Sequence, residues 1–247
     1  MFVHRFALPV AVWGALVCVA AVAASGCGGA FGSDGPTATA TSTPRPTATP
    51  TPEAPDLTIF RGFLFPLAGA CLPESDALMP NAPREYRGGV HEGVDFYGYD
   101  NCTEIVADTT VLAPKDGIVV RSDLDYTDLT EEELAAANER IANGGANDFD
   151  IIDLFRGRQV WIDHGKGIIT RYAHLSGIAE GITEGARVAA GQPVAYVGDS
   201  GTPESLSNPG QETHLHWELR VGETFLGAAL PPAEVREIYG RVFEPLD

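Results

Sequence analysis

The stretch HLHWELRV, residues 214–221, alternates polar and apolar side chains. In a β-strand, successive side chains point to opposite faces of the sheet, so His214, His216 and Glu218 share one face. The apolar residues between them point into the core. The sequence therefore predicts a core strand that carries two imidazoles into one cleft. A lone His-x-His pair on a strand is more often structural or exposed than metal-binding, so other residues must decide its role.

The region from residue 105 to residue 221 consists of short β-rich runs separated by Gly, Pro and Asp. Connections such as DHGKG, residues 163–167, are short and contain glycine, as hairpin turns require. Neighbouring strands should therefore be antiparallel. The predicted fold class is mainly β, an antiparallel β-sheet or sandwich, and such short connections disfavour a parallel α/β sheet.

Residues 123–157 interrupt this pattern as an acidic insertion. Thr130 followed by Glu133 forms a capping box, residues 134–141 favour a helix, and the Gly-Gly pair after Asn143 ends it. One inserted helix is therefore expected. The acidic start of the insertion lacks the glycine and the final glutamate of a calcium-binding loop, so we interpret the insertion as a solvated helical flap.

The N-terminal part of the chain has the composition of an export segment followed by a spacer. Residues 1–26 combine a basic start, an apolar run and small residues, which predicts a signal peptide. The run ASGC at 24–27 is similar to a lipoprotein cleavage box, so we expect a lipid anchor at Cys27 on the outer face of the cell membrane. Secretion, or retention by an uncleaved N-terminal anchor, are the alternatives. Residues 27–56, rich in Pro, Thr and Ala, predict an extended linker, and residues 57–247 a single domain.

Charge and cysteine content limit the partners and the compartment. The formal net charge is −18, from 34 acidic and 16 basic residues, which argues against nucleic acid because phosphate contacts depend on Lys and Arg. Membrane contact is expected only through the N-terminal lipid or signal anchor. In an oxidising compartment Cys71 and Cys102 are expected to form a disulfide, with free thiols as the alternative. Their spacing is not the C-x-x-C of structural zinc sites.

His91 and Asp95 provide the support that the His-x-His pair requires. They are four residues apart, on one face of a helix or a strand, and with His216 they supply two imidazoles and one carboxylate. Three protein ligands leave the fourth tetrahedral position open, as in catalytic zinc sites. An exposed polar turn is the alternative interpretation. Glu92 is not expected to act as a base, because the glycine-rich segment around it favours a turn and a strand, in which Glu92 points away from the metal.

Seven short motifs occur in order along the chain and together resemble the lysostaphin-type peptidoglycan endopeptidases, family twenty-three of the metallopeptidases. They are FPL at 65–67, HEGVD at 91–95, APKDG at 113–117, IDHGKG at 162–167, RYAHLS at 171–176, GQ at 191–192 and HLHWE at 214–218. The resemblance implies the antiparallel β fold of that family, a duplicated hybrid motif, with one Zn²⁺ held by His91, Asp95 and His216. It also implies that His174 and His214 are the catalytic histidines.

The implied function is that of a zinc metalloendopeptidase that hydrolyses peptide bonds in peptidoglycan crosslinks or stem peptides. Zinc lowers the pKa of its bound water and polarises the scissile carbonyl, and a neighbouring imidazole can accept the proton. We expect His214 to be the base or to orient the water, and His174 to stabilise the oxyanion or the leaving amine; the sequence leaves the order open. His164 lies in a predicted hairpin turn and is interpreted as structural or exposed. The insertion and residues 202–213 are long enough to wall the substrate groove.

Two other functions are compatible with parts of the sequence. A catalytically silent member of the same fold would act as an activator or a cell-wall-binding module, but none of the five expected site residues is missing. A lipoyl- or biotinyl-type carrier is suggested by APKDG and GQPVAYVG. However, neither lysine of the chain, Lys115 or Lys166, has the hairpin setting that such a carrier needs.

Overall fold

The structure is a computed structural model that describes residues 57–85 and 88–245. The expected signal peptide, residues 1–26 with the lipidation site that follows it, and the expected linker, residues 27–56, lie outside the described residues. Within the part of the chain that is described, no helix is long and apolar enough to cross a membrane.

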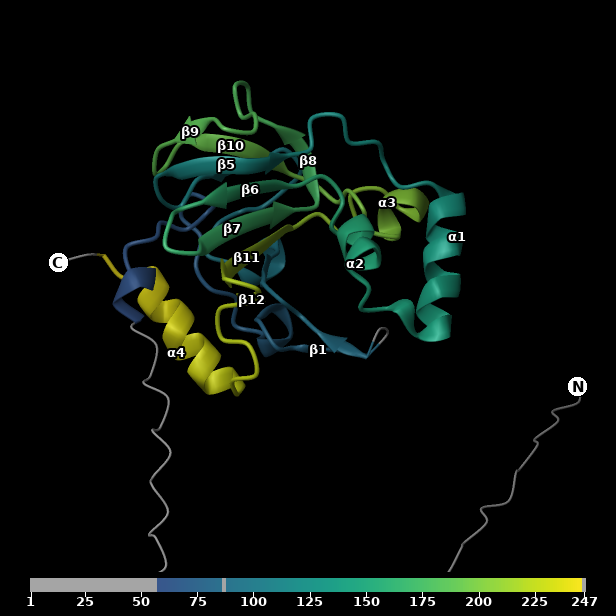
Figure 1. Cartoon of the computed structure of the whole chain (residues 1–247), viewed down its shortest axis with the longest axis horizontal. Helices are drawn as coiled ribbons and strands as arrows, with labels where there is room; N and C mark the ends of the chain where they lie inside the picture. Colours follow the sequence, from purple (N-terminus) through teal and green to yellow (C-terminus); the bar gives the residue numbers. More distant parts are fainter. Residues whose placement is uncertain (1–56, 86–87, 246–247) are drawn as a thin grey trace, which may run out of the picture. The chain divides into compact units, whose positions relative to one another are not determined.

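Antiparallel β-sheets form the body of the domain (Figure 1), which confirms the predicted fold class. The largest sheet has the strand order β12-β11-β7-β6-β5-β9, and β3 also pairs with β11. Its strands are β3 (Val94–Phe96), β5 (Gly117–Ser122), β6 (Val160–Asp163), β7 (Ile168–Ala173), β9 (Arg187–Val188), β11 (Leu215–Val221) and β12 (Thr224–Phe225). A second sheet, β4-β10-β8, consists of β4 (Thr110–Leu112), β8 (Leu175–Ile178) and β10 (Pro193–Val197), and a third pairs β1 (Pro83–Arg84) with β2 (Gly89–Val90).

Strand β11 carries the alternation that the sequence predicts. Leu215, Trp217 and Leu219 are fully buried and belong to the hydrophobic core. The intervening His216 and Glu218 lie on the opposite face, where they are also buried, because other parts of the protein cover them. Strand β11 is therefore buried on its polar face as well as on its apolar face.

Helices occupy the connections and one end of the chain. They are η1 (Leu57–Phe60), η2 (Asp76–Leu78), η4 (Gly98–Asp100), α1 (Glu131–Arg140), the π-helical turn η5 (Ile141–Gly145), α2 (Phe149–Arg156), α3 (Glu204–Ser207) and α4 (Pro232–Val242). In α4, Val235, Tyr239 and Val242 recur at helical spacing and are buried against the core. The ring of Tyr239 meets that of Trp217 edge to face, with 6.4 Å between centroids.

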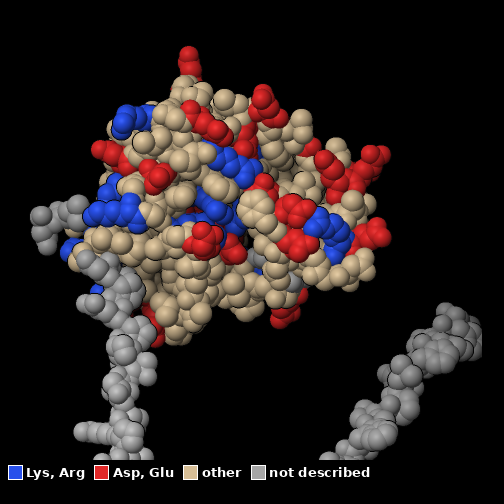
Figure 2. Space-filling view, in the orientation of Figure 1, with Lys and Arg blue, Asp and Glu red and all other residues tan. Residues whose placement is uncertain are grey.

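The insertion contains two α-helices, α1 and α2, where the sequence predicted one. The predicted capping box between Thr130 and Glu133 begins α1. The second helix was missed because its apolar run is short, and short apolar runs are typical of buried strands as well as of helices. Acidic side chains gather on the side of the molecule where α1 lies (Figure 2), as expected for a solvated helix. In contrast, α2 buries Ile151 and Arg156, so the description as a solvated flap fits α1 better than α2.

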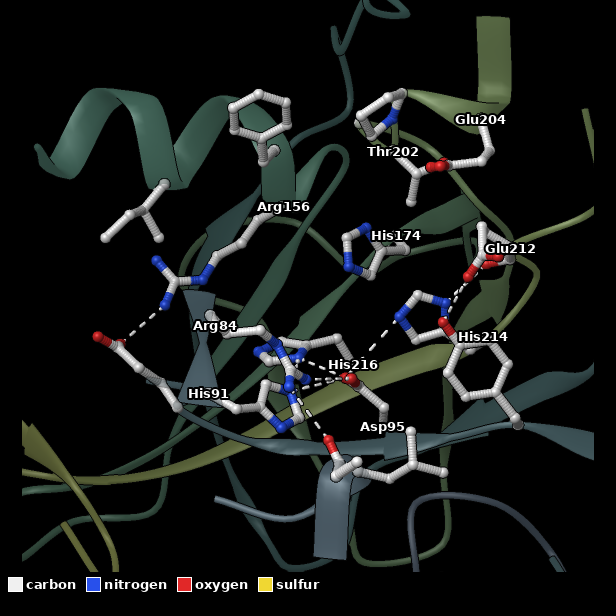
Figure 3. Close-up of a pocket in the computed structure, with 18 of the residues that line it drawn as sticks. Arg84, His91, Asp95, Arg156, His174, Thr202, Glu204, Glu212, His214 and His216 are labelled. Atoms are coloured by element: carbon white, nitrogen blue, oxygen red, sulfur yellow. Dashed lines mark hydrogen bonds and ion pairs between the residues drawn. The ribbon is translucent and has the colours of Figure 1, made fainter. Parts of the chain in front are cut away.

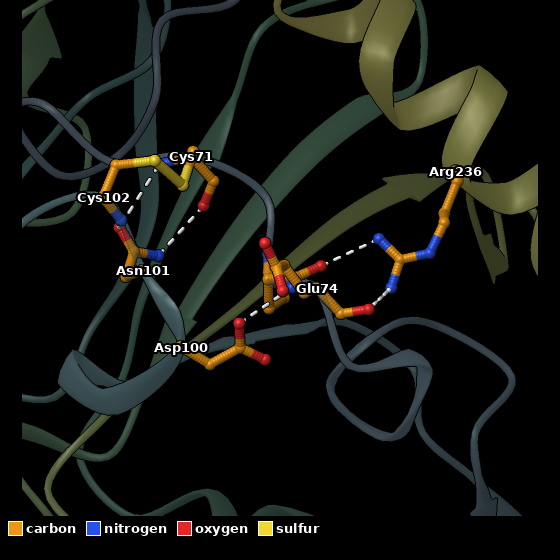
Figure 4. Close-up of a disulfide and its surroundings, with 7 residues drawn as sticks. Cys71, Glu74, Asp100, Asn101, Cys102 and Arg236 are labelled. Carbon is orange, nitrogen blue, oxygen red and sulfur yellow. Dashed lines mark hydrogen bonds between the residues drawn. A yellow bond between two sulfur atoms is a disulfide. The ribbon is translucent and has the colours of Figure 1, made fainter.

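The expected disulfide between Cys71 and Cys102 is present (Figure 4). The side chain of Asn101 bonds the backbone of both cysteines. The segment that follows Cys71 is held a second time by Arg236 of α4. Its guanidinium donates to the Asp76 carboxylate at 2.6 Å and to two backbone carbonyl groups. The segment between the two cysteines, residues 71–102, contains His91 and Asp95.

Candidate active site

The three predicted metal ligands, His91, Asp95 and His216, converge in the structure. Asp95 lies in the middle of β3 directly opposite His216 of β11, and His91 follows β2 by one residue. The Oδ1 atom of Asp95 lies 2.9 Å from Nε2 of His91 and 2.7 Å from Nδ1 of His216, and the two nitrogens are 3.0 Å apart. All three side chains are buried and close enough to share one metal ion.

Gly93 allows this approach between the two segments. A Cβ atom at this position would lie 2.5 Å from the carbonyl oxygen of Trp217 and 3.0 Å from the ring of His216. Real Cβ atoms essentially never make contacts under 3.0 Å, so the contact with the Trp217 carbonyl could not form. Any side chain at position 93 would therefore push the turn that carries His91 away from β11.

The outer partners of the three side chains show which atoms are available to a cation. Nδ1 of His91 lies 3.1 Å from the carbonyl of Met79, which only accepts hydrogen bonds, so Nδ1 carries the proton and Nε2 of the neutral ring is a free acceptor. Nε2 of His216 faces the Glu218 carboxylate at 3.1 Å in the same way. Lone pairs from both rings and from the Asp95 carboxylate therefore meet at one point, which fits the nitrogen and oxygen ligands of zinc.

Charge around this point also favours a cation. Burial opposes the ionisation of Asp95, but the neighbouring His91 and His216 outweigh it and hold the pKa of Asp95 well below its usual range. Burial lowers the pKa of His216, but the carboxylates of Asp95 and Glu218 outweigh burial and raise this pKa to about 9. The same carboxylates favour a metal ion in place of that proton. The second oxygen of Asp95 is held by Arg84, whose Nη2 lies 3.1 Å away.

The two expected catalytic histidines lie beside the three ligands. Nδ1 of His174 donates to the carbonyl of Ser200 at 2.9 Å, and Nδ1 of His214 donates to the carbonyl of Glu212 at 2.6 Å. Each ring therefore keeps an accepting Nε2, and that of His214 lies 3.8 Å from Oδ1 of Asp95. Burial lowers the pKa of both rings, most strongly that of His174, which also has two histidine neighbours. Both rings are therefore neutral near pH 7 and able to accept a proton.

His174 adopts an unusual backbone conformation directly after β7. Its φ is 59°, in the left-handed region that is uncommon for residues other than glycine. Its backbone N–H donates to the carbonyl of Arg156 at 2.8 Å, which ties it to the end of α2. Such strained positions concentrate at functional sites, where the surrounding structure holds them in place.

Tyr97 and Glu212 hold His214 and were not identified from the sequence. The Tyr97 ring stacks on the His214 ring with 4.3 Å between centroids, and its hydroxyl donates to Oε2 of Glu212 at 2.7 Å. Burial, followed by the nearby carboxylates, raises the pKa of Tyr97 and keeps it a phenol. One signal was available, because Tyr97 is two residues after Asp95 in an extended segment and therefore lies on the same side.

A buried group of charges connects the insertion to the metal ligands. Arg156 of α2 binds Oε2 of Glu92 at 3.0 Å and also pairs with Glu218, the partner of His216. Arg220 binds the same two carboxylates, at 2.6 Å for Glu92 and 3.0 Å for Glu218. Burial opposes the charge on Glu218, but Arg156, followed by His216 and Arg220, outweighs it and lowers the pKa of Glu218. Glu92 therefore serves an arginine network and lies outside the three-ligand group, in keeping with its rejection as a base.

A cavity of about 600 Å³ opens over the histidines (Figure 3). The insertion and the loop at 202–213, both expected to wall a groove, contribute to its lining. In Figure 3, Arg156 lies on one side of His174 and Glu212 on the other. His164 is outside the cavity, where its ring nitrogens bond the carbonyl of Asp116 and the hydroxyl of Thr170, so its role is structural, as expected.

Comparison with known proteins places this chain in a family. The model of peptidase family M23 matches residues 89–227, more than half of the chain. A zinc-containing peptidase from Vibrio cholerae is 21% identical over 69% of this chain and 41% of its own, with a TM-score of 0.43. This chain therefore corresponds to less than half the length of that peptidase.

Two other solved structures are similar over a larger share of their own length. The catalytic domain of lysostaphin from Staphylococcus simulans is 21% identical over 62% of this chain and 85% of its own, with a TM-score of 0.38. A mutant catalytic domain of a prophage-encoded M23 protein from Enterococcus faecalis is 18% identical over 66% of this chain and 93% of its own, with a TM-score of 0.41. A comparison with curated proteins gives no match. Because the family model covers more than half of the sequence, the chain belongs to peptidase family M23.

Proposed function

We propose that the chain is a zinc metalloendopeptidase that cleaves peptide bonds in the crosslinks or stem peptides of bacterial peptidoglycan. The observation that carries this proposal is the meeting of three ligand lone pairs, from His91, Asp95 and His216, beside two neutral imidazoles in one cavity. A zinc ion bound there would polarise the scissile carbonyl and lower the pKa of an attacking water. The remaining tasks, proton transfer and orientation, fall to residues of the chain.

His214 is assigned the role of base or water-orienting residue. Its accepting Nε2 is 3.8 Å from a ligand oxygen, and both Tyr97 and the Glu212 carbonyl fix the ring. A proton taken at Nε2 can then be returned to the leaving amine. His174, with its ring centroid 4.6 Å from that of His214, is assigned to the oxyanion or the leaving amine. The only proton of the neutral ring is on Nδ1 and is donated to the Ser200 carbonyl. His174 can therefore donate a hydrogen bond from Nε2 only after Nε2 has gained a proton.

The location of the chain is also part of this proposal. A signal peptide, a lipid anchor at Cys27 and a Pro/Thr/Ala-rich linker would place the domain outside the cytoplasm, where peptidoglycan lies. The support for this comes from the sequence of residues 1–56 alone. Labelling of cells with a radioactive fatty acid, compared between the unaltered chain and Cys27→Ser, would test the anchor.

Two substitutions separate metal binding from catalysis. His216→Ala removes a ligand and should strip the metal, whereas His214→Ala should keep most of the metal and lose turnover. Zinc content and release of peptide fragments from purified peptidoglycan are measured for both variants and for the unaltered chain. Near-normal turnover by His214→Ala would contradict its role. A zinc-loaded, unaltered chain that cleaves no peptidoglycan from any source would contradict the proposed activity.

A further inference from the structure

The insertion turns an apolar face toward the catalytic cavity. Ile151, Ile152 and Phe155 of α2 line the cavity, and their spacing of three and four residues places them on one side of the helix. Ile141, from the π-helical turn before α2, lines the cavity as well. These four residues are called the apolar wall. Ile141, Ile152 and Phe155 are only partly buried by the protein, so they leave apolar surface free toward the cavity.

The other sides of α2 make different contacts. Asp153 pairs with Arg121 at 2.6 Å and faces away from the cavity. Phe149, at the start of the helix, is 62% exposed and lies outside the cavity lining. The apolar residues in the cavity are thus a distinct face of the helix, and Phe149 offers a matched residue outside it.

The apolar wall is held directly beside the candidate catalytic groups. Phe155 is followed by Arg156, whose carbonyl accepts the His174 backbone N–H at 2.8 Å and whose guanidinium pairs with the buried Glu218. Phe155 and His174 both line the cavity, so a substrate bound at His174 shares the cavity with the apolar wall. On the Glu212 side of the cavity the lining is aromatic, with Tyr97 and the 76% exposed Tyr99.

We propose that the apolar wall binds an aliphatic side chain of the substrate peptide next to the scissile bond, so that side-chain-bearing peptides are cleaved in preference to polyglycine. This inference rests on the proposed peptidase function. Each methyl or methylene group buried there should raise kcat/KM about fourfold. A longer side chain should be preferred to glycine by at least about tenfold. Glycine gains nothing from such a wall because it has no side chain to bury.

The test compares peptides that differ only in one side chain. The bond that the full chain cleaves is first mapped by mass analysis of peptidoglycan fragments, and each residue flanking it is then replaced by glycine in synthetic peptides. We expect kcat/KM to fall about fourfold for an alanine replaced by glycine and at least about tenfold for a longer side chain. Phe155→Ala should largely remove this preference, whereas Phe149→Ala should keep it. Equal cleavage of both peptides, or equal preference in both variants, would overturn the inference.

Binding measurements separate this inference from the proposed function. The dissociation constants of a peptidoglycan stem peptide and of versions with each side chain replaced in turn by hydrogen (glycine) are measured for the zinc-free chain by calorimetry, where no cleavage occurs and no mapped cleavage site is needed. If no peptide is cleaved but the side-chain-bearing peptide binds more tightly, and Phe155→Ala removes that difference, the apolar wall is supported and the peptidase function fails. If both peptides bind equally to the unaltered chain, the wall has no role in recognition.

Discussion

Replacement of Gly157 by alanine tests the geometry of the site most directly. Gly157 follows α2 with φ 65° and ψ −145°, a combination that is open almost only to glycine. A Cβ atom at this position would lie 2.2 Å from the carbonyl oxygen of Ser200 and 2.6 Å from its Oγ. That carbonyl accepts the hydrogen bond from Nδ1 of His174. Gly157→Ala therefore moves the group that orients a candidate catalytic histidine.

The size of the effect follows from the size of the collision. Because Cβ contacts under 3.0 Å essentially never occur, the Ser200 carbonyl must move by roughly 1 Å. Misplacement of a catalytic group by about 1 Å costs about 100-fold in rate. The backbone strain itself costs about 1–3 kcal/mol of stability. We expect kcat for peptide hydrolysis to fall about 100-fold, while KM and zinc content stay close to those of the unaltered chain.

Gly185→Ala is the matched control for this experiment. Gly185 also has a positive φ, 83°, but a Cβ atom there would meet no other atom within 4 Å. Steady-state hydrolysis of one peptide, zinc content and urea unfolding are measured for both variants and the unaltered chain, at a temperature where all are folded. If Gly157→Ala were as active as Gly185→Ala, the link from Gly157 through Ser200 to His174 would be refuted. Loss of zinc from Gly157→Ala would also contradict it, because His174 is not a proposed ligand.

Three further changes test neighbouring contacts. Tyr97→Leu removes the ring stacked on the candidate base, so kcat should fall about tenfold with zinc retained. Tyr97→Phe keeps the ring and should lose less activity. Equal rates for both variants and the unaltered chain would exclude a role for stacking. Arg84→Gln should weaken zinc binding about 10- to 100-fold in a chelator competition, because Asp95 loses its charged partner, and an unchanged affinity would show that the pair is dispensable. Serine in place of both Cys71 and Cys102, which close a loop of 31 residues, should lower the free energy of unfolding by about 4 kcal/mol in urea denaturation. The same double variant should keep its kcat, because neither cysteine lines the cavity, and a large loss of turnover would contradict this.

The parts of the fold that the sequence predicts are those determined by local patterns. Alternation along residues 214–221 is enough to place one core strand, because side chains in a strand repeat every two residues. The capping box at Thr130 is equally local and marks the start of α1. The grouping of His91, Asp95 and His216 could be predicted from the sequence. The spacing of four residues between His91 and Asp95, and the alternation around His216, already place the polar side chains of each segment on one face. The direct pairing of Asp95 with His216 across two strands is then a consequence of the sheet register.

The parts that the sequence does not predict depend on contacts between distant segments. In the sequence, Arg156 is one basic residue at the end of an acidic insertion. Its ion pair with Glu218, 62 residues away, is visible only in the folded chain. Glu212 is likewise a loop residue until Tyr97, 115 residues away, is placed beside it. Neither distance nor partner can be read from a local pattern, because the approach is set by how the insertion and the loops pack on the sheet.

The end of the insertion connects the apolar wall of the cavity to a candidate metal ligand and to a candidate catalytic histidine. Arg156 reaches His174 through its carbonyl and reaches His216 through Glu218, whose Oε1 lies 3.1 Å from the His216 ring. Glu218 is fully buried, and loss of one partner from a buried ion pair costs about 3–5 kcal/mol. In a chain of this fold without the insertion, Arg220 would still bind this carboxylate, but the ion pair with Arg156 would be lost. Because Phe155 of the apolar wall directly precedes Arg156, a substitution that displaces α2 should also shift the contacts of Arg156 with Glu218 and His174, whereas one that only shortens a side chain of the wall should leave them in place.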